Sequence, residues 1–166
     1  MYSIGDYVVK SNEGVCRIEE RVRMKSFDQV ERPYFLLVPV SDPRAKLYIP
    51  DTEEYRDVRP VMTKEEALLL ISRVNEIACT QIDNDKLREK TYKEALHSNN
   101  PEKLVGIIKS LFLRGEERKG AGKKVTVVDD RCFKAAENAL YSELSFVLEK
   151  EVGQVRQMIM ETASSR

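Results

Sequence analysis

The sequence predicts an α+β protein in which a small five-stranded β-barrel precedes an all-α helical bundle. Up to about Pro60, short runs of β-branched and aromatic residues alternate with turn residues, and no helical period is visible. From Thr63 onward, apolar residues recur three and four positions apart, which is the period of an amphipathic helix. We therefore expect one domain at residues 1–60 and a second at residues 61–166.

The predicted barrel consists of five short strands joined by tight turns. The turn residues "SNEG" at positions 11–14 separate a strand at residues 7–9 from one that begins at Val15. The stretch "RVRMKSF" at 21–27 alternates loosely and predicts a third strand. The apolar run "PYFLLVPV" at 33–40 is typical of a strand buried on both faces. After the turn "SDPR", residues 45–50 complete the barrel as its fifth strand.

The second half has helix start and stop signals. Thr63 with Glu66 three positions later forms a capping box, and Asn100 followed by Pro101 is a typical helix N-terminus. Thr126 with an aspartate three positions later resembles a second capping box. A further helix is expected from about residues 83–85 to 97, and a last one from about residue 152. Between them, "RGEERKGAGKKVTV" at 114–127 predicts a basic loop.

Charge is unevenly distributed along the chain, although 28 basic and 28 acidic residues give a formal net charge of zero. Residues 86–124 hold 11 basic and 5 acidic side chains, a local net charge of +6. This segment predicts a basic surface that neutralises phosphates without reading bases, but a solvated charged face is an equally open interpretation. The candidate DNA-contacting residues are Lys86, Arg88, Lys90, Lys93, Arg114, Arg118, Lys119, Lys123 and Lys124.

No motif in the chain recommends an enzyme. The "GAGKK" stretch lacks the spacing and the Ser/Thr of a phosphate-binding loop, and His97 is typical of a helix C-terminus. The three cysteines are far apart, which predicts core residues in a reducing compartment and no zinc site. The sequence shows neither a signal peptide nor an apolar run of membrane-spanning length. We expect a cytoplasmic protein without a cofactor, a small-molecule substrate or a membrane partner.

Three stretches, in this order and spacing, resemble the CarD/CdnL family of bacterial transcription regulators. They are "IGDYVVKSNEGVCRIEE" at 4–20, "LYIPD" followed by "VRPVMTKEEA" at 47–67, and the segment from "REKTYKEALHSNNPEKL" to "ENALYSELS" at 88–145. The "GKKVT…D" pattern is similar to the branch found in Firmicutes. The resemblance covers nearly the whole chain.

The resemblance implies both a fold and a function. It implies a Tudor-like (SH3-like) RNA-polymerase-interaction domain at residues 1–60, shared with the transcription-repair coupling factor, that docks on the β subunit. The helical domain would contact promoter DNA at the upstream edge of the transcription bubble and modulate open-complex stability, without sequence specificity. Carried over by position, the polymerase contacts fall at Arg23 and Met24 on the third predicted strand and at Lys46 and Tyr48 on the fifth. An exposed strand edge with an aromatic anchor is physically suited to this role.

One departure from the family leaves a second hypothesis open. Well-studied members insert a tryptophan into the minor groove, but this chain has no tryptophan, and Asn84 or Asp85 stands at that position. A carboxylate cannot unstack bases as an apolar wedge does. The alternative is therefore a protein–protein adaptor that binds polymerase and makes no direct contact with DNA. With zero net charge, any DNA affinity would be weak unless polymerase holds the domain in place.

Overall fold

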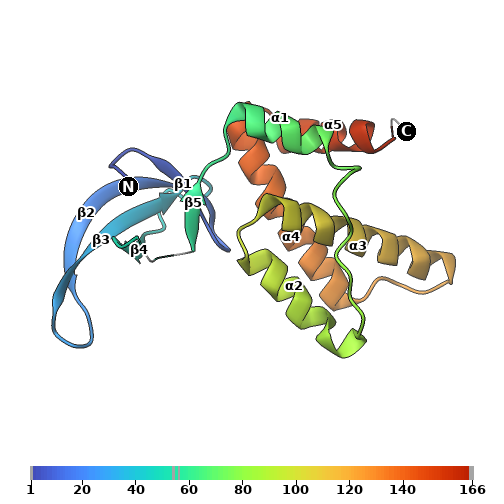
Figure 1. The fold of residues 1–166 in the computed structure, drawn as a ribbon, viewed down its shortest axis with the longest axis horizontal. Coiled ribbons are helices and arrows are strands. Elements are labelled where there is room, and N and C mark those ends of the chain that lie inside the picture. The colour runs from blue at the N-terminus through green and yellow to red at the C-terminus, as the bar shows by residue number, and fades with distance from the viewer. Residues whose placement is uncertain (1, 54, 56, 165–166) are drawn as a thin grey trace. The chain divides into compact units, whose positions relative to one another are not determined.

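The computed structural model describes residues 2–53, 55 and 57–164. The chain divides into two compact units, Met1–Val61 and Met62–Arg166, so the division lies next to the predicted boundary at Pro60. Figure 1 shows an N-terminal unit made of strands and a C-terminal unit made of helices. The α+β class predicted from the sequence is confirmed.

The N-terminal unit is a five-stranded sheet in which every neighbouring pair of strands is antiparallel. The strand order is β4-β3-β2-β1-β5, so β4 and β5 occupy the ends of the sheet. The strands are β1 (Tyr7–Lys10), β2 (Gly14–Lys25), β3 (Glu31–Pro39), β4 (Leu47–Pro50) and β5 (Val58–Pro60).

The number of strands matches the prediction, but two of the predicted strands were assigned wrongly. Residues 21–27 do not form a separate third strand, because β2 continues from Gly14 to Lys25 through a bulge at Glu19. A bulge bends a strand without ending it. Because the alternation of side chains shifts by one residue at the bulge, the sequence there looks like the end of one strand and the start of another. β5 was missed because it has only three residues and is held by pairing with β1. Arg23 and Met24 therefore lie on β2, and Tyr48 lies on the fourth strand.

The core of the sheet comes from alternate residues that face one side. It contains Val8, Cys16, Ile18, Phe35, Leu37 and Ile49, all of them buried. The prediction that the β3 run is buried on both faces is confirmed only at its middle. Leu36 is buried although it points away from this cluster, whereas Tyr34 and Val38 on the same face are half-buried and Val40 is exposed. Successive side chains of a strand face opposite sides, which explains why an unbroken apolar run occurs here.

Helices of the C-terminal unit begin where the capping residues predicted them. Thr63 and Glu66 make both hydrogen bonds of a capping box, and Asn100 and Thr126 each accept a backbone N–H at a helix start. The helical elements are α1 (Lys64–Ser72), the short 3₁₀ helix η1 (Asp85–Leu87), α2 (Arg88–His97), α3 (Pro101–Gly120), α4 (Val127–Leu148) and α5 (Val152–Ser164).

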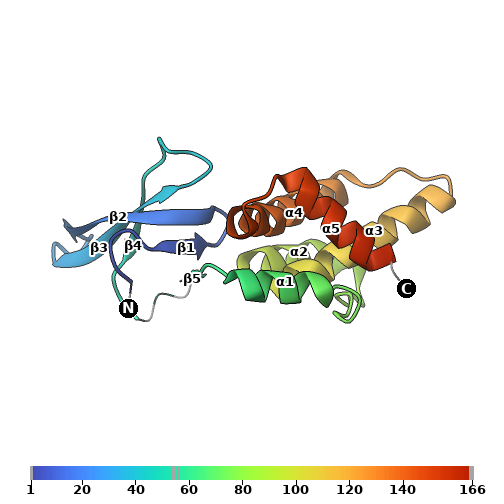
Figure 2. The ribbon, with the colours of Figure 1, turned by 90° about the horizontal axis from the view of Figure 1, so that it is seen from above.

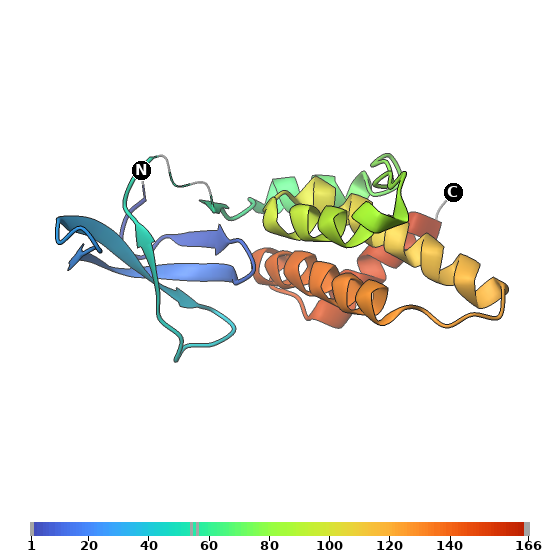
Figure 3. The ribbon, with the colours of Figure 1, turned by 90° about the horizontal axis from the view of Figure 1, so that it is seen from below.

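The basic loop predicted at residues 114–127 is largely helical, so that prediction was wrong. α3 continues to Gly120, and only residues 121–126 connect it to α4. Arg118 and Lys119 in the last turn favour the continuation because cations stabilise a helix C-terminus. The connection turns at Gly122, whose φ of 74° suits a residue without Cβ, and runs back toward the start of α4 (Figures 2 and 3).

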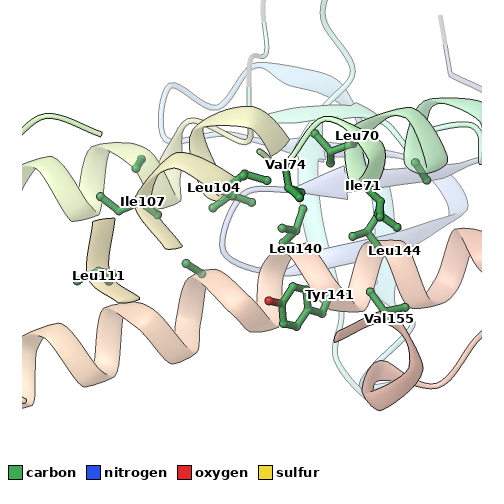
Figure 4. Packing of buried hydrophobic residues seen from close by; sticks show 14 of the residues in the cluster. Leu70, Ile71, Val74, Leu104, Ile107, Leu111, Leu140, Tyr141, Leu144 and Val155 are labelled. Carbon is green, nitrogen blue, oxygen red and sulfur yellow. The ribbon is translucent and has the colours of Figure 1, made fainter. Parts of the chain in front are cut away.

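A single apolar cluster joins the helices of the C-terminal unit. Figure 4 shows Leu70 and Ile71 of α1, Leu104 and Ile107 of α3, and residues of α4 and α5 facing one another. Leu144 of α4 and Val155 of α5 are fully buried within it. Within the described part of the chain, none of the helices has the length and apolar character needed to span a membrane.

Candidate protein-docking edge and basic helical surface

β4 presents an aromatic side chain at one end of the sheet. Ile49 points into the core and is 2% exposed, whereas its neighbour Tyr48 points outward and is 47% exposed. Tyr48 stands opposite Leu36 of β3, so the two side chains share the sheet face that lies away from the core. Lys46 is also exposed and immediately precedes β4. An aromatic residue on an outer strand is suited to contact with a protein.

The other two predicted contact residues lie on opposite faces of β2. Met24 pairs with Arg32 of β3, and the alternation along β3 places Met24 on the same face as Tyr48. Arg23 pairs with Pro33 and faces the other side, where its Nε lies 3.6 Å from Glu31. The structure therefore gathers Met24 and Tyr48 on one face, and it does not place Arg23 with them.

β2 and β3 extend beyond the rest of the sheet as a two-stranded ribbon, which we call the β-arm (residues 21–33). β1 pairs only with the first part of β2, and β4 pairs with β3 only from Tyr34 to Leu37. Figure 1 shows the ribbon ending in a hairpin turn. At this turn, the sequence interpretation missed Phe27, whose side chain is fully exposed.

The basic residues of α2 and η1 fall into two groups. Lys86, Lys90 and Lys93 line one shallow groove together with Glu89 and Glu94 of the same helix face. Lys90 lies 3.9 Å from Glu94, and Lys93 lies 3.5 Å from Glu89, so two of the three lysines are partly neutralised. No described acidic side chain forms an ion pair with Lys86.

Arg88 and Arg114 belong to a buried polar network that joins α2, α3 and α4. Arg88 donates to the Tyr92 hydroxyl at 3.1 Å, and this hydroxyl donates to Asp129 at 2.8 Å. The Nε of Arg114 donates to the other carboxylate oxygen of Asp129 at 2.7 Å. Asp129 is 3% exposed. The structure thus uses both arginines to hold helices together, and they do not lie on the face formed by Lys86, Lys90 and Lys93.

The network shifts the pKa values of its members. Burial by itself would raise the pKa of Asp129, but hydrogen bonds from Arg114 and Tyr92 outweigh it and lower that pKa. Burial raises the pKa of Tyr92 to about 12, with a further increase from its hydrogen bond to Asp129. Asp129 is therefore ionised and Tyr92 neutral at pH 7, which gives each hydrogen bond its required donor and acceptor.

The remaining predicted DNA-contacting residues lie at the C-terminal end of α3 and on the connection that follows it. Arg118 donates to the carbonyl of Lys124 at 2.9 Å and thereby fastens the connection to the helix. Lys119 lies 3.7 Å from Glu116, whereas Lys123 and Lys124 are exposed, with no ion pair among the described residues. These four residues form a second basic region, and the groove of Lys86, Lys90 and Lys93 does not include them.

The position that a tryptophan occupies in the resembling family is polar here. The side chain of Asn84 caps η1 by accepting the N–H of Lys86 at 2.9 Å. Asp85 is exposed and accepts from Arg88 at 2.8 Å, and this hydrogen bond lowers the pKa of Asp85. Both side chains therefore stabilise the start of α2, and neither offers an apolar wedge.

An apolar groove of about 720 Å³ lies among α3, α4 and α5, lined in part by Ile108, Phe112, Phe133 and Ile159. The acidic groups along it are engaged in ion pairs. Glu137 lies 3.7 Å from Arg156, and the other acidic lining residues that pair are Glu116 with Lys119, Asp129 with Arg114 and Asp130 with Lys134. Within the described ranges, no cluster of three or more His, Cys, Asp or Glu residues could hold a metal ion. The groove was not predicted because its lining comes from three separate helices.

Comparison with known families bears on the N-terminal unit. Comparison with curated proteins gave no match. Residues 2–62 match the family model described as the CarD-like/TRCF RID domain, where RID denotes the RNA-polymerase-interaction domain. These residues coincide with the five-stranded sheet and include β4 with Tyr48. The N-terminal unit is therefore similar to this Tudor-like domain, and the match indicates a protein that interacts with RNA polymerase.

Proposed function

We propose that the protein is a non-enzymatic transcription regulator that docks on the β subunit of bacterial RNA polymerase and holds its helical unit near promoter DNA. The observation that supports this most strongly is the RID match over residues 2–62. Within the CarD/TRCF-like type, we assign the chain to the CdnL group and to its Firmicutes-like branch, on the sequence patterns given above. Such a protein would work in the bacterial cytoplasm, where polymerase is.

Docking would use the β4 end of the sheet. Tyr48 offers an exposed ring, and Lys46 offers a charge beside it. Met24 widens the same face by a flexible apolar side chain. Because β4 pairs with β3 alone in the described sheet, its other edge is available for main-chain pairing with a strand of the partner. Arg23, on the opposite face, would contribute through charge at most.

DNA contact would use the lysines that the structure leaves exposed. These are Lys86, Lys90 and Lys93 on one helix face and Lys119, Lys123 and Lys124 at the end of α3. Phosphate contacts of this kind are independent of sequence and fall with salt concentration. Since the net charge of the whole chain is zero, affinity for free DNA would be low. Tethering to polymerase raises the effective concentration and makes the contact useful for open-complex stability.

A protein–protein adaptor is the second candidate, and a specific observation favours it. Arg88 and Arg114, two of the predicted DNA contacts, are used inside the helical unit. Lys90 and Lys93 are each close to a glutamate, and Asp85 replaces the apolar wedge by a carboxylate. In the adaptor hypothesis, the helical unit would contact another protein on the polymerase and leave DNA untouched.

Salt-dependent binding to forked promoter DNA in the presence of polymerase separates the two candidates. The regulator hypothesis predicts that Lys86→Ala/Lys90→Ala/Lys93→Ala reduces the slope of log K against log salt by about two to three. Glu102→Gln, an exposed change at the start of α3, serves as the control for a charge change on another helix. An unchanged slope in the triple variant would favour the adaptor.

The non-enzymatic part of the proposal rests on how the titratable groups are used. Asp129 and Glu137 are engaged with arginines. Burial raises the pKa of the Cys16 thiol to about 11 and also raises the pKa of Cys132, so both thiols stay protonated and unreactive at pH 7. A catalytic role would require a group poised near neutral pH beside a bound substrate.

A further inference from the structure

The turn of the β-arm exposes an aromatic side chain completely. Phe27 is 107% exposed, which means that it contacts solvent as fully as in an extended peptide. Met24 and Val30, on either side of the turn, are also exposed at 37% and 50%. Burying none of its surface, Phe27 contributes nothing to the core, and an exposed phenylalanine at a hairpin tip raises the risk of aggregation. We therefore look for a binding partner that would cover Phe27.

The turn that presents Phe27 is held in one conformation by Asp28. The carboxylate accepts two hydrogen bonds from the Arg32 guanidinium, at 2.9 and 2.6 Å, and one from the Ser26 hydroxyl at 2.6 Å. It also accepts the backbone N–H of Val30 at 3.1 Å. The hydrogen bonds from Arg32 and Ser26 hold the pKa of Asp28 well below its usual range. Two backbone bonds, from Ser26 to Val30 and from Gln29 to Ser26, close the loop.

This arrangement resembles a binding element that is ordered before it meets its partner. An exposed five-residue turn normally samples many conformations, and fixing them on binding weakens affinity. Here, one carboxylate links both ends of the turn, so that Phe27 is held outward in the free protein. Rigid aromatic side chains with apolar neighbours are the residue type that dominates protein–protein hot spots.

The charges of the β-arm indicate what kind of surface it would meet. Residues 21–32 hold four basic side chains and two acidic ones, a net charge of +2. Asp28 and Glu31 are each paired with an arginine of the arm, and Arg21 lies 2.5 Å from Asp51, just after β4. Lys25 is the basic side chain of the arm with which no described acidic group forms an ion pair. A complementary partner is therefore apolar at its centre and acidic at the part of its rim that faces Lys25. A nucleic acid would place phosphates beside Asp28 and Glu31, which favours a protein over DNA or RNA.

We propose that the tip of the β-arm is a preformed anchor whose Phe27 inserts into an acidic-rimmed apolar pocket of the protein that the N-terminal unit binds. The proposal rests on the proposed function, because it takes RNA polymerase as that partner. Met24 shares its sheet face with Tyr48, so the arm tip continues the candidate docking surface along the ribbon. Phe27 would be a further contact with polymerase, in addition to the contacts predicted at Arg23, Met24, Lys46 and Tyr48.

The test is the affinity of the full-length chain for purified RNA polymerase β subunit, measured by biolayer interferometry. Phe27→Ala should weaken binding at least tenfold, and Phe27→Leu should restore part of it because an apolar side chain is kept. Val40→Ala is the matched control, since Val40 is an exposed apolar residue outside the arm, and it should leave the affinity unchanged.

A second variant tests the role of the ordered turn without removing the aromatic ring. Arg32→Gln keeps Phe27 but removes the bidentate hydrogen bonds to Asp28, and it should weaken binding by about three- to tenfold. In the double variant with Phe27→Ala, the effect of Arg32→Gln should largely disappear, because there is then no anchor to orient. Fully additive effects would contradict the proposed coupling.

The outcomes separate the two proposals from each other. If the wild-type chain does not bind the β subunit, the docking function fails, and the anchor fails with it. If the wild-type chain binds and Phe27→Ala binds equally well, only the anchor is overturned. Sedimentation with vesicles of anionic phospholipid is a further experiment. Vesicle binding that depends on Phe27, together with unchanged polymerase binding, would overturn the anchor in favour of a membrane contact.

Discussion

Two regions of the molecule depend on an aspartate that accepts several hydrogen bonds, and they use it differently. In the β-arm, Asp28 is exposed and binds Arg32, Ser26 and the Val30 amide within one turn. In the helical unit, Asp129 is buried and connects side chains from two other helices. Asp28 orders an exposed turn, whereas Asp129 links helices inside the helical unit.

The burial of the partner carboxylate indicates whether an arginine is more important for binding or for stability. Arg32 and Arg114 are similar in the sequence, since each is a basic side chain near candidate contact residues. The structure distinguishes them by burial: Arg114 pairs with Asp129, whose side chain is 4% exposed, and Arg32 pairs with Asp28, whose side chain is 50% exposed. Loss of a buried partner leaves an uncompensated charge, while loss of an exposed partner leaves a charge that water solvates.

The largest effect is expected from breaking the buried pair. Asp129→Asn should lower the free energy of unfolding by about 3 kcal/mol, at the low end for such pairs because Arg114 is partly exposed. Urea denaturation of the full-length chain measures this change. The matched control is Asp130→Asn at the next position, whose partner Lys134 is solvent-exposed. Equal losses in the two variants would show that burial does not govern the network.

Acid should weaken the helical unit through the same residue. Since the pKa of Asp129 is lower in the folded chain than the ordinary value of about 3.9, its contribution to stability is fully present above about pH 4. The contribution is lost as the pH falls through the lower folded value. Thermal melts between pH 2 and pH 6 should therefore show a steeper decline for the wild type than for Asp129→Asn. Parallel curves would contradict this account.

A smaller effect is expected from the hydroxyl that links Arg88 to Asp129. Tyr92→Phe should cost about 1–2 kcal/mol of stability, because Asp129 then loses a buried donor. The pKa of about 12 for Tyr92 lies above its ordinary value of about 10, so its contribution is present below pH 10 and is lost as the pH rises to about 12. The variant should lack this alkaline component in denaturant titrations at pH 9–12.

The smallest effect on stability is expected at the arm tip. Phe27→Ala should leave the urea midpoint unchanged within error, because the ring buries no surface in the free chain. Circular dichroism should also be unchanged. A clear loss of stability would mean that Phe27 packs within the folded chain, and it would remove the main reason for assigning it to a partner.

Local signals in the sequence predicted much of this fold, and long-range contacts explain where prediction stopped. Thr63 with Glu66 and Asn100 with Pro101 identify helix starts because capping involves only neighbouring residues. β5 could not be predicted, since its three residues are ordered by pairing with β1. Arg88 was predicted as a DNA contact because the sequence does not show that Tyr92, four positions on in the same helix, links it to Asp129 on α4, 41 positions further along the chain.

The candidate docking site could likewise be predicted only where local alternation decides which way a side chain points. The exposure of Tyr48 follows from the alternation with Ile49 and could be expected once β4 was placed. The separation of Arg23 from Met24 on opposite faces required the register of β2 against β3. Phe27 gave no signal of its own, because an aromatic residue next to a turn is equally typical of a covered strand end.

The central claim, that the N-terminal unit provides the polymerase contact, is tested most directly by one binding experiment. Dissociation constants for purified RNA polymerase β subunit are measured for the wild-type chain, for Lys46→Glu/Tyr48→Ala and for Lys90→Ala/Lys93→Ala. We predict a loss of at least tenfold for the first variant, from the removed aromatic anchor and the reversed charge, and no change for the second. Equal affinities for all three chains, or a loss confined to the helical variant, would contradict the account.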